Sequence, residues 1–129
     1  MMIIAMAFAI LSALLHVFIF YMESISWTSE KTRSTFGMSE EAAENTKEMA
    51  FNQGFYNLFL AIEVFAGVGL YITGAQGVGL ALMLFGTGSM LAAALLLFVT
   101  SPDKRSAAIK QGTLPLIAVI ALILTMVLY

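Results

Sequence analysis

The sequence predicts an all-α fold: a polytopic membrane protein built as an antiparallel four-helix transmembrane bundle. Of the 129 residues, 60% are apolar and only 11% are charged, whereas a soluble domain carries about 25% charged residues. The apolar residues gather in four stretches, each close to the roughly 20 residues that a helix needs to cross the hydrocarbon core. This length suits one domain, residues 1–129, made of the four helices.

The four predicted spans cover about residues 2–27, 46–72, 77–99 and 112–129. The first stretch lacks a basic leading region and is too long for the apolar part of a signal peptide, so we interpret it as a helix of the bundle. Before the second span, Ser39 can cap a polar helix start, and Glu40 and Glu41 in the first turn favour the helix dipole. Residues 73–77 predict a tight connection, and residues 100–103 predict a turn.

The basic residues predict the orientation. All six Lys and Arg residues lie near the first and third connections, and none lies at either terminus or in the second connection. The positive-inside rule therefore places the loops 28–45 and 100–111 in the cytoplasm and both termini outside. The residues counted are Lys31, Arg33, Lys47, Lys104, Arg105 and Lys110.

Composition also limits the chemistry. The chain contains no cysteine and one histidine, which excludes disulfides, thiolate metal sites and thiol catalysis. No spacing of His, Asp and Glu matches a metal-binding motif, and no loop resembles a phosphate-binding loop. We therefore predict no metal and no cofactor. The net charge of −2 gives no reason to expect a nucleic-acid partner, so the predicted surroundings are the lipid bilayer.

Polar side chains form stripes along the first two spans. At 100° per residue, one face of the first span holds small residues at its outer end and ionisable residues at its inner end. Since a charge at mid-bilayer costs about 2.5–3.5 kcal/mol, we expect these stripes to face each other around a polar pocket open to the cytoplasm, with Gln111 of the fourth span in its wall. The alternative is plain interhelical hydrogen bonding. The stripes are Ala5, Ala9, Ser12, His16, Glu23 and Trp27 in the first span; Glu48, Asn52, Tyr56 and Glu63 in the second; and Gln53 with Asn57 beside them.

The third span has no ionisable group but many small residues, which let helix backbones approach closely. We expect them to pack within the monomer, and a homodimer through this span is the alternative. The small residues are Gly79, Gly86, Gly88, Ser89, Ala92 and Ala93.

Several segments together resemble one family. These are residues 16–23 (HVFIFYME) with Trp27, then Phe36-Gly37, the run Asn52-Gln-Gly-Phe-Tyr-Asn57, and Gln111-Gly-Thr-Leu-Pro115. The chain resembles the bacterial integral-membrane family catalogued as domain of unknown function 1304. The resemblance implies a small four-helix protein of the bacterial inner membrane, and it implies no established activity. It emphasises residues already found in the stripes, together with Gly54, where we expect another backbone to come close or a bound group to find room, and Pro115, expected in the first turn of the last helix.

Three functional hypotheses follow. The first is binding or transport of a small molecule, with Glu23 and His16 as titratable groups. The second is a membrane-embedded enzyme, such as an isomerase of a lipid-like substrate, in which the same two residues act as acid and base. The third is an accessory subunit of a membrane complex. The candidate ligand-binding residues are His16, Glu23, Trp27, Asn52, Gln53, Tyr56, Asn57 and Gln111, with Glu63 as a secondary candidate.

Overall fold

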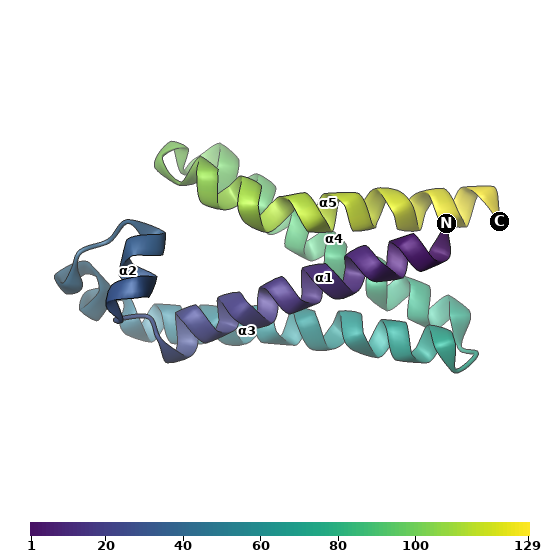
Figure 1. Ribbon diagram of the computed structural model, residues 1–129, viewed down its shortest axis with the longest axis horizontal. Coiled ribbons are helices and arrows are strands. Elements are labelled where there is room, and N and C mark those ends of the chain that lie inside the picture. Colours follow the sequence, from purple (N-terminus) through teal and green to yellow (C-terminus); the bar gives the residue numbers. More distant parts are fainter.

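The computed structural model describes all residues from Met1 to Tyr129 and confirms the predicted fold class, an all-α bundle (Figure 1). Four of its helices are long and apolar enough to cross a membrane. In chain order, the elements are α1 (Met2–Phe20), the π-helical turn η1 (Tyr21–Ile25), α2 (Glu30–Phe36), α3 (Glu40–Ile72), α4 (Gln76–Thr100), the 3-10 turn η2 (Pro102–Lys104) and α5 (Arg105–Leu128).

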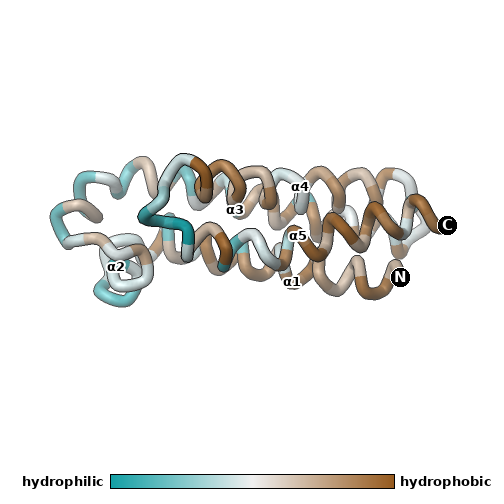
Figure 2. Tube along the Cα trace, turned by 90° about the horizontal axis from the view of Figure 1, so that it is seen from above, coloured by the Kyte–Doolittle hydropathy of each residue, from teal (hydrophilic) through white to brown (hydrophobic).

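The four long helices form a ring in which α1 packs against α3 and α5, and α4 packs against the same two helices from the opposite corner. Both termini lie at one end of the bundle, and α2 lies at the other (Figure 1). The hydrophilic residues are concentrated at the α2 end, whereas the end with the termini is largely apolar (Figure 2). The bundle therefore has one polar end and one apolar end.

Helix caps explain where the polar segments begin and end. The Ser39 side chain accepts a hydrogen bond of 3.1 Å from the Ala42 amide, which confirms the predicted cap of α3. Ser29 caps α2 in the same way. This short helix, which the sequence did not predict, ends at Gly37, whose φ of 65° lies in the left-handed region that glycine adopts without strain.

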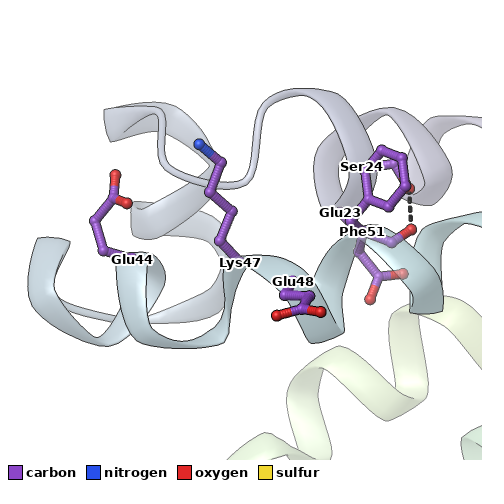
Figure 3. A pocket seen from close by; sticks show the side chains of 6 residues that line it. All are labelled: Glu23, Ser24, Glu44, Lys47, Glu48 and Phe51. Carbon is purple, nitrogen blue, oxygen red and sulfur yellow. Dashed lines mark hydrogen bonds between the residues drawn. The ribbon is translucent and has the colours of Figure 1, made fainter.

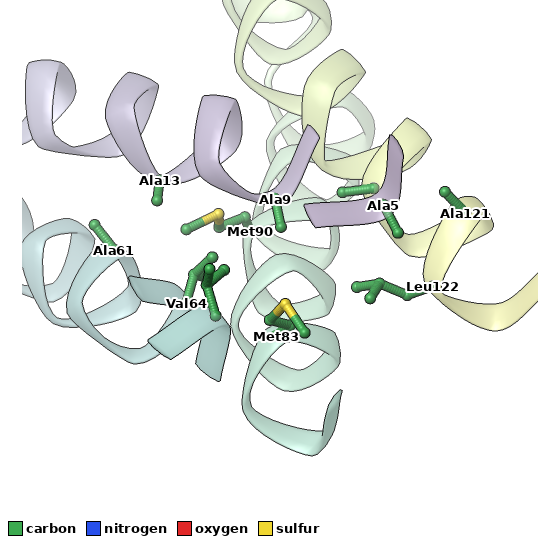
Figure 4. Packing of buried hydrophobic residues seen from close by; sticks show 11 residues of the cluster. Ala5, Ala9, Ala13, Ala61, Val64, Met83, Met90, Ala121 and Leu122 are labelled. Carbon is green, nitrogen blue, oxygen red and sulfur yellow. The ribbon is translucent and has the colours of Figure 1, made fainter. Parts of the chain in front are cut away.

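The core shared by all four long helices occupies only the half of the bundle near the termini, and Figure 4 shows its side chains from close by. In α1 its buried apolar residues end at Ala13, and in α3 they begin at Ala61. In α4 they end at Met90, and in α5 they begin at Ala118. The core consists of Ala5, Ala9, Ala13, Ala61, Val64, Val68, Met83, Met90, Ala118, Ala121 and Leu122.

Toward the α2 end the bundle separates into two pairs of helices. Gly54 of α3 contacts Ser24 beside α1, and Gly112 of α5 contacts Ala94 of α4. The ribbons of α4 and α5 diverge from those of α1 and α3 in this direction (Figure 1). Each pair is therefore packed internally here, while the core common to all four helices is confined to the other half.

The small residues of α4 lie on two different faces of the helix. Gly79 and Gly86 are buried against α3, as expected for packing within the monomer. Gly88 has open space around it and lies in a shallow groove on the outer face with Leu84, Phe85, Ser89 and Ala92. The homodimer predicted through this helix remains a prediction.

One expectation about the last helix, the position of Pro115, needs correction. It begins at Arg105, well before the predicted membrane entry, so Pro115 lies inside the helix rather than in its first turn. Proline has no N–H to donate to the carbonyl four residues earlier, which here belongs to Gln111. Pro115 is nevertheless buried, so it acts as a packing residue at the place where α5 approaches the core.

Candidate functional site

A carboxylate and an amide connect two helices at the center of the candidate site. Glu23 lies in η1, within the candidate membrane span Met2–Ile25. The Asn57 side-chain nitrogen donates a hydrogen bond of 2.6 Å to its Oε1 atom. Asn57 is on α3, and its Nδ2 atom also lies 3.3 Å from the Gln53 carbonyl of its own helix. This arrangement holds a carboxyl group against a neutral donor, which leaves the second carboxyl oxygen free for a ligand or a proton.

Beside this pair, Ser24 fills the space at Gly54. The Ser24 hydroxyl donates a hydrogen bond of 2.7 Å to the Phe51 carbonyl (Figure 3). A Cβ atom at Gly54 would overlap the Ser24 Oγ atom and lie 3.0 Å from its Cβ atom. The close approach of another backbone at Gly54 is confirmed, because the Ser24 nitrogen would lie 3.0 Å from a Cβ atom there; the room for a bound group is wrong, because Ser24 occupies that space.

An open hollow lies next to the pair, on the polar side of η1 (Figure 3). Its volume is about 440 Å³, and three of its lining residues are glutamates. One lysine also lines it, so the carboxylates outnumber the ammonium group three to one. The lining residues are Glu23, Ser24, Glu44, Lys47, Glu48 and Phe51. With this excess of carboxylates, the hollow suits a cationic group.

His16 is separate from this hollow. Its side chain is 3% exposed, and its Nδ1 atom lies 2.9 Å from the Ser12 carbonyl oxygen of the same helix. Because a carbonyl oxygen can only accept, Nδ1 carries the proton in this contact. No hydrogen bond joins His16 to Glu23, whose partner is Asn57. The two groups that the sequence suggested as an acid–base pair are thus engaged with different partners.

Three of the four residues in the first polar stripe of α3, all except Glu48, do not face α1, contrary to our expectation. Asn52 is exposed and donates to the Glu48 carbonyl of its own helix at 3.0 Å. Tyr56 is 64% exposed. At 100° per residue, these two residues and the half-buried Glu63 lie about 180° from Gly54, which contacts Ser24 beside α1. Asn57 of the second stripe forms a hydrogen bond to η1, and Glu48 is the one residue of the first stripe that lines the hollow with Glu23.

The remaining candidates, Trp27, Gln53 and Gln111, do not line the hollow. The Trp27 indole donates to the Thr46 hydroxyl at 3.1 Å, and its ring packs on Phe36 with centroids 5.1 Å apart. Gln53 is exposed and Gln111 is half-buried. Neither lines the hollow beside Glu23. Whether any of these residues binds a ligand remains a prediction.

Sequence reasoning missed several participants, including Lys47 and Phe51, which line the hollow. Ser24 was not selected, although a small polar residue beside an intramembrane glutamate and a helical glycine on the neighbouring span were both visible. Glu44 is not among the sequence candidates, yet it lines the hollow. Thr46, the partner of Trp27, carried no signal, because its role depends on how the connection between the helices folds back.

The four long apolar helices and their packing define the class: an α-helical multi-pass membrane protein. Within this class, the chain belongs to the family described as protein of unknown function (DUF1304), whose model matches residues 10–123. The matched range contains Glu23, Asn57 and every residue that lines the hollow. No curated protein and no solved structure matches the chain.

Proposed function

We propose that this protein binds a small organic cation at the hollow beside Glu23, as the first step of carrying it across the membrane. The observation that carries the proposal is the hydrogen bond of 2.6 Å between Asn57 and Glu23. It holds a carboxyl group in place within a membrane-spanning segment, at the edge of an acidic hollow. Ionisable groups inside a membrane are costly, and they usually mark the path of a substrate or proton.

The charge of the hollow favours a cation over an anion. Glu23, Glu44 and Glu48 contribute three carboxylates and Lys47 contributes one ammonium group, which gives a formal charge of −2 when all are ionised. Two unit charges 4 Å apart attract by about 4 kcal/mol at an effective dielectric constant near 20. Because the hollow is open, solvent and salt reduce this value. A cation with an apolar body would still gain from contact with Phe51.

The distribution of basic residues indicates the side of entry. All six Lys and Arg residues lie in or beside α2, the start of α3 and the η2–α5 region. By the positive-inside rule this end faces the cytoplasm, in the inner membrane of a bacterium as the family resemblance implies. The cation would then enter from the cytoplasm, and the four-helix core would seal the outer half. An intramembrane carboxyl group can exchange a proton for the cation, which would couple its movement to a proton gradient.

Equilibrium binding of tetraphenylphosphonium to the purified protein in lipid nanodiscs tests the proposal. We expect binding by the wild type and at least a tenfold loss of affinity in Glu23→Gln, which corresponds to about 1.4 kcal/mol. The control is Glu30→Gln, since Glu30 lies on α2 and does not line the hollow; its affinity should match the wild type. The neutral analogue triphenylphosphine oxide should bind Glu23→Gln and wild type equally. Equal tetraphenylphosphonium affinity in wild type and Glu23→Gln would refute the proposal.

A further inference from the structure

The segment that carries Glu23 is not an ordinary α-helix. The Ser26 amide donates to the Tyr21 carbonyl at 3.0 Å, five residues earlier, which closes a π-helical turn over Tyr21–Ile25. π-Helical turns are rare and are frequently found at functional sites. A π-turn changes the angular spacing of the residues within it, so the direction of Glu23 depends on whatever holds this turn in place.

Ser24 connects the π-turn to the neighbouring helix α3. Phe51, Gly54 and Asn57 follow one another at intervals of three and therefore lie along one side of α3. Ser24 contacts the first two of them, through its hydrogen bond of 2.7 Å to the Phe51 carbonyl and its close packing on Gly54. Glu23, the preceding residue, accepts a hydrogen bond from Asn57, the third.

We infer that Ser24 is a positioning residue, which together with Gly54 fixes the π-turn on α3 so that the Glu23 carboxyl group meets Asn57. The inference deepens the proposed function and rests on it for the identity of the ligand. The positioning itself is a property of the unliganded protein. Gly54 is required because any Cβ atom there would push Ser24, and with it the π-turn, away from α3.

The first experiment follows the Glu23 carboxyl group directly. Solid-state NMR of protein labelled with ¹³C-glutamate in bilayers gives its side-chain carboxyl signal, assigned by its loss in Glu23→Gln. We expect this signal to shift in Ser24→Ala, which removes the hydroxyl but keeps the Cβ atom, and to shift in the same direction in Asn57→Ala. The matched control is Thr113→Ala, since that exposed hydroxyl bonds only to the Ile109 carbonyl of its own helix. An unchanged Glu23 signal in Ser24→Ala would overturn the inference.

The second experiment connects the positioning to ligand binding. Ser24→Ala should weaken tetraphenylphosphonium binding by about threefold, the equivalent of an average interhelical hydrogen bond in a membrane protein. An unchanged affinity despite a shifted Glu23 signal would overturn the role of Ser24 in binding. If the Glu23 signal shifts in Ser24→Ala but the wild type does not bind the cation at all, the positioning stands and the proposed function fails.

A third variant tests Gly54 even if Gly54→Ala alone does not fold. In the double variant Ser24→Gly with Gly54→Ala, the new methyl group no longer meets the serine side chain and keeps one close approach, 3.0 Å to the backbone nitrogen of residue 24. We expect the double variant to fold, because the overlap with the serine side chain is removed, and to show a shifted Glu23 signal, because the hydrogen bond to the Phe51 carbonyl is missing. A wild-type Glu23 signal in this variant would overturn the inference.

Discussion

The close approach of α3 and α4 predicts that Gly79→Ala destabilises the protein. A Cβ atom at Gly79 would lie 2.5 Å from the Tyr71 amide nitrogen, 2.6 Å from the Gly67 carbonyl oxygen and 2.7 Å from the Tyr71 Cβ atom. Two of these three atoms are backbone, so no side-chain rotation can relieve the contact. The helices themselves must separate.

The size of the effect follows from these distances. An ordinary contact for such atoms begins near 3.4 Å, so the helices must move apart by nearly 1 Å. Overpacking of this kind typically costs about 1–3 kcal/mol. Alanine regains up to about 1 kcal/mol of helix propensity. We therefore expect Gly79→Ala to lower the free energy of unfolding by about 1–2 kcal/mol.

Unfolding in detergent micelles by added sodium dodecyl sulfate, followed by far-UV circular dichroism, measures this change. The matched control is Gly88→Ala on the same helix, since a Cβ atom at Gly88 meets nothing within 4 Å. Its stability should equal or exceed that of the wild type. If Gly79→Ala were as stable as Gly88→Ala, the close packing of α3 on α4 would be wrong.

Three further predictions concern the site, the core and the orientation. Asn57→Ala removes the donor to Glu23 and should cost about 1 kcal/mol in the same unfolding assay; if Glu23→Gln alone also loses stability and the double variant loses less than the sum of the two single losses, the side chains act as a pair, whereas additive losses would contradict the contact. Met83→Ala empties a site that is 0% exposed and should cost about 2 kcal/mol, near the low end for buried methionine because lipid replaces water around the separated helices; no loss would contradict the core. The chain has no cysteine, so Ala75→Cys should react in whole cells with a membrane-impermeant maleimide and Ser106→Cys only after permeabilisation; the reverse pattern would invert the orientation.

The four helices could be predicted because a bilayer demands long apolar segments, and these are plain in the sequence. The buried face of α1 was also predictable. Ala5, Ala9, Ser12 and His16 recur at helical spacing, and all four are buried. The Ser39 cap could be predicted for a local reason, since one hydroxyl satisfies an amide three residues later.

The direction of the α3 stripes could not be decided in the same way. In a bilayer, apolar residues face both lipid and protein, so hydrophobicity does not separate the two sides of a helix. Small residues separate them better, because helices in membranes approach most closely where side chains are short. Ala50, Gly54 and Ala61 mark the face toward α1, and Asn52 lies opposite. Weighting these residues above the polar ones would have selected Asn57 alone.

The π-turn and the contacts that hold it cannot be predicted from the periodicity of one helix. A count at 100° per residue assumes α-helical geometry, which ends at Phe20. The hydrogen bonds from Ser24 to Phe51 and from Asn57 to Glu23 join residues 27 and 34 positions apart. Such contacts depend on how far α1 and α3 are shifted relative to each other along their axes. The connection through α2 determines this axial register. The sequence placed Glu23 among the candidates but did not indicate its partner.

Chemical labelling of Glu23 in the intact membrane tests the cation site most directly. N,N′-Dicyclohexylcarbodiimide reacts with protonated carboxyl groups in apolar surroundings, and mass spectrometry of peptides locates the adduct. We expect a Glu23 adduct whose yield falls as tetraphenylphosphonium is added, with no such protection of Glu63, which does not line the hollow. A Glu23 adduct that forms equally at all cation concentrations, or protection at Glu63 instead, would contradict the site.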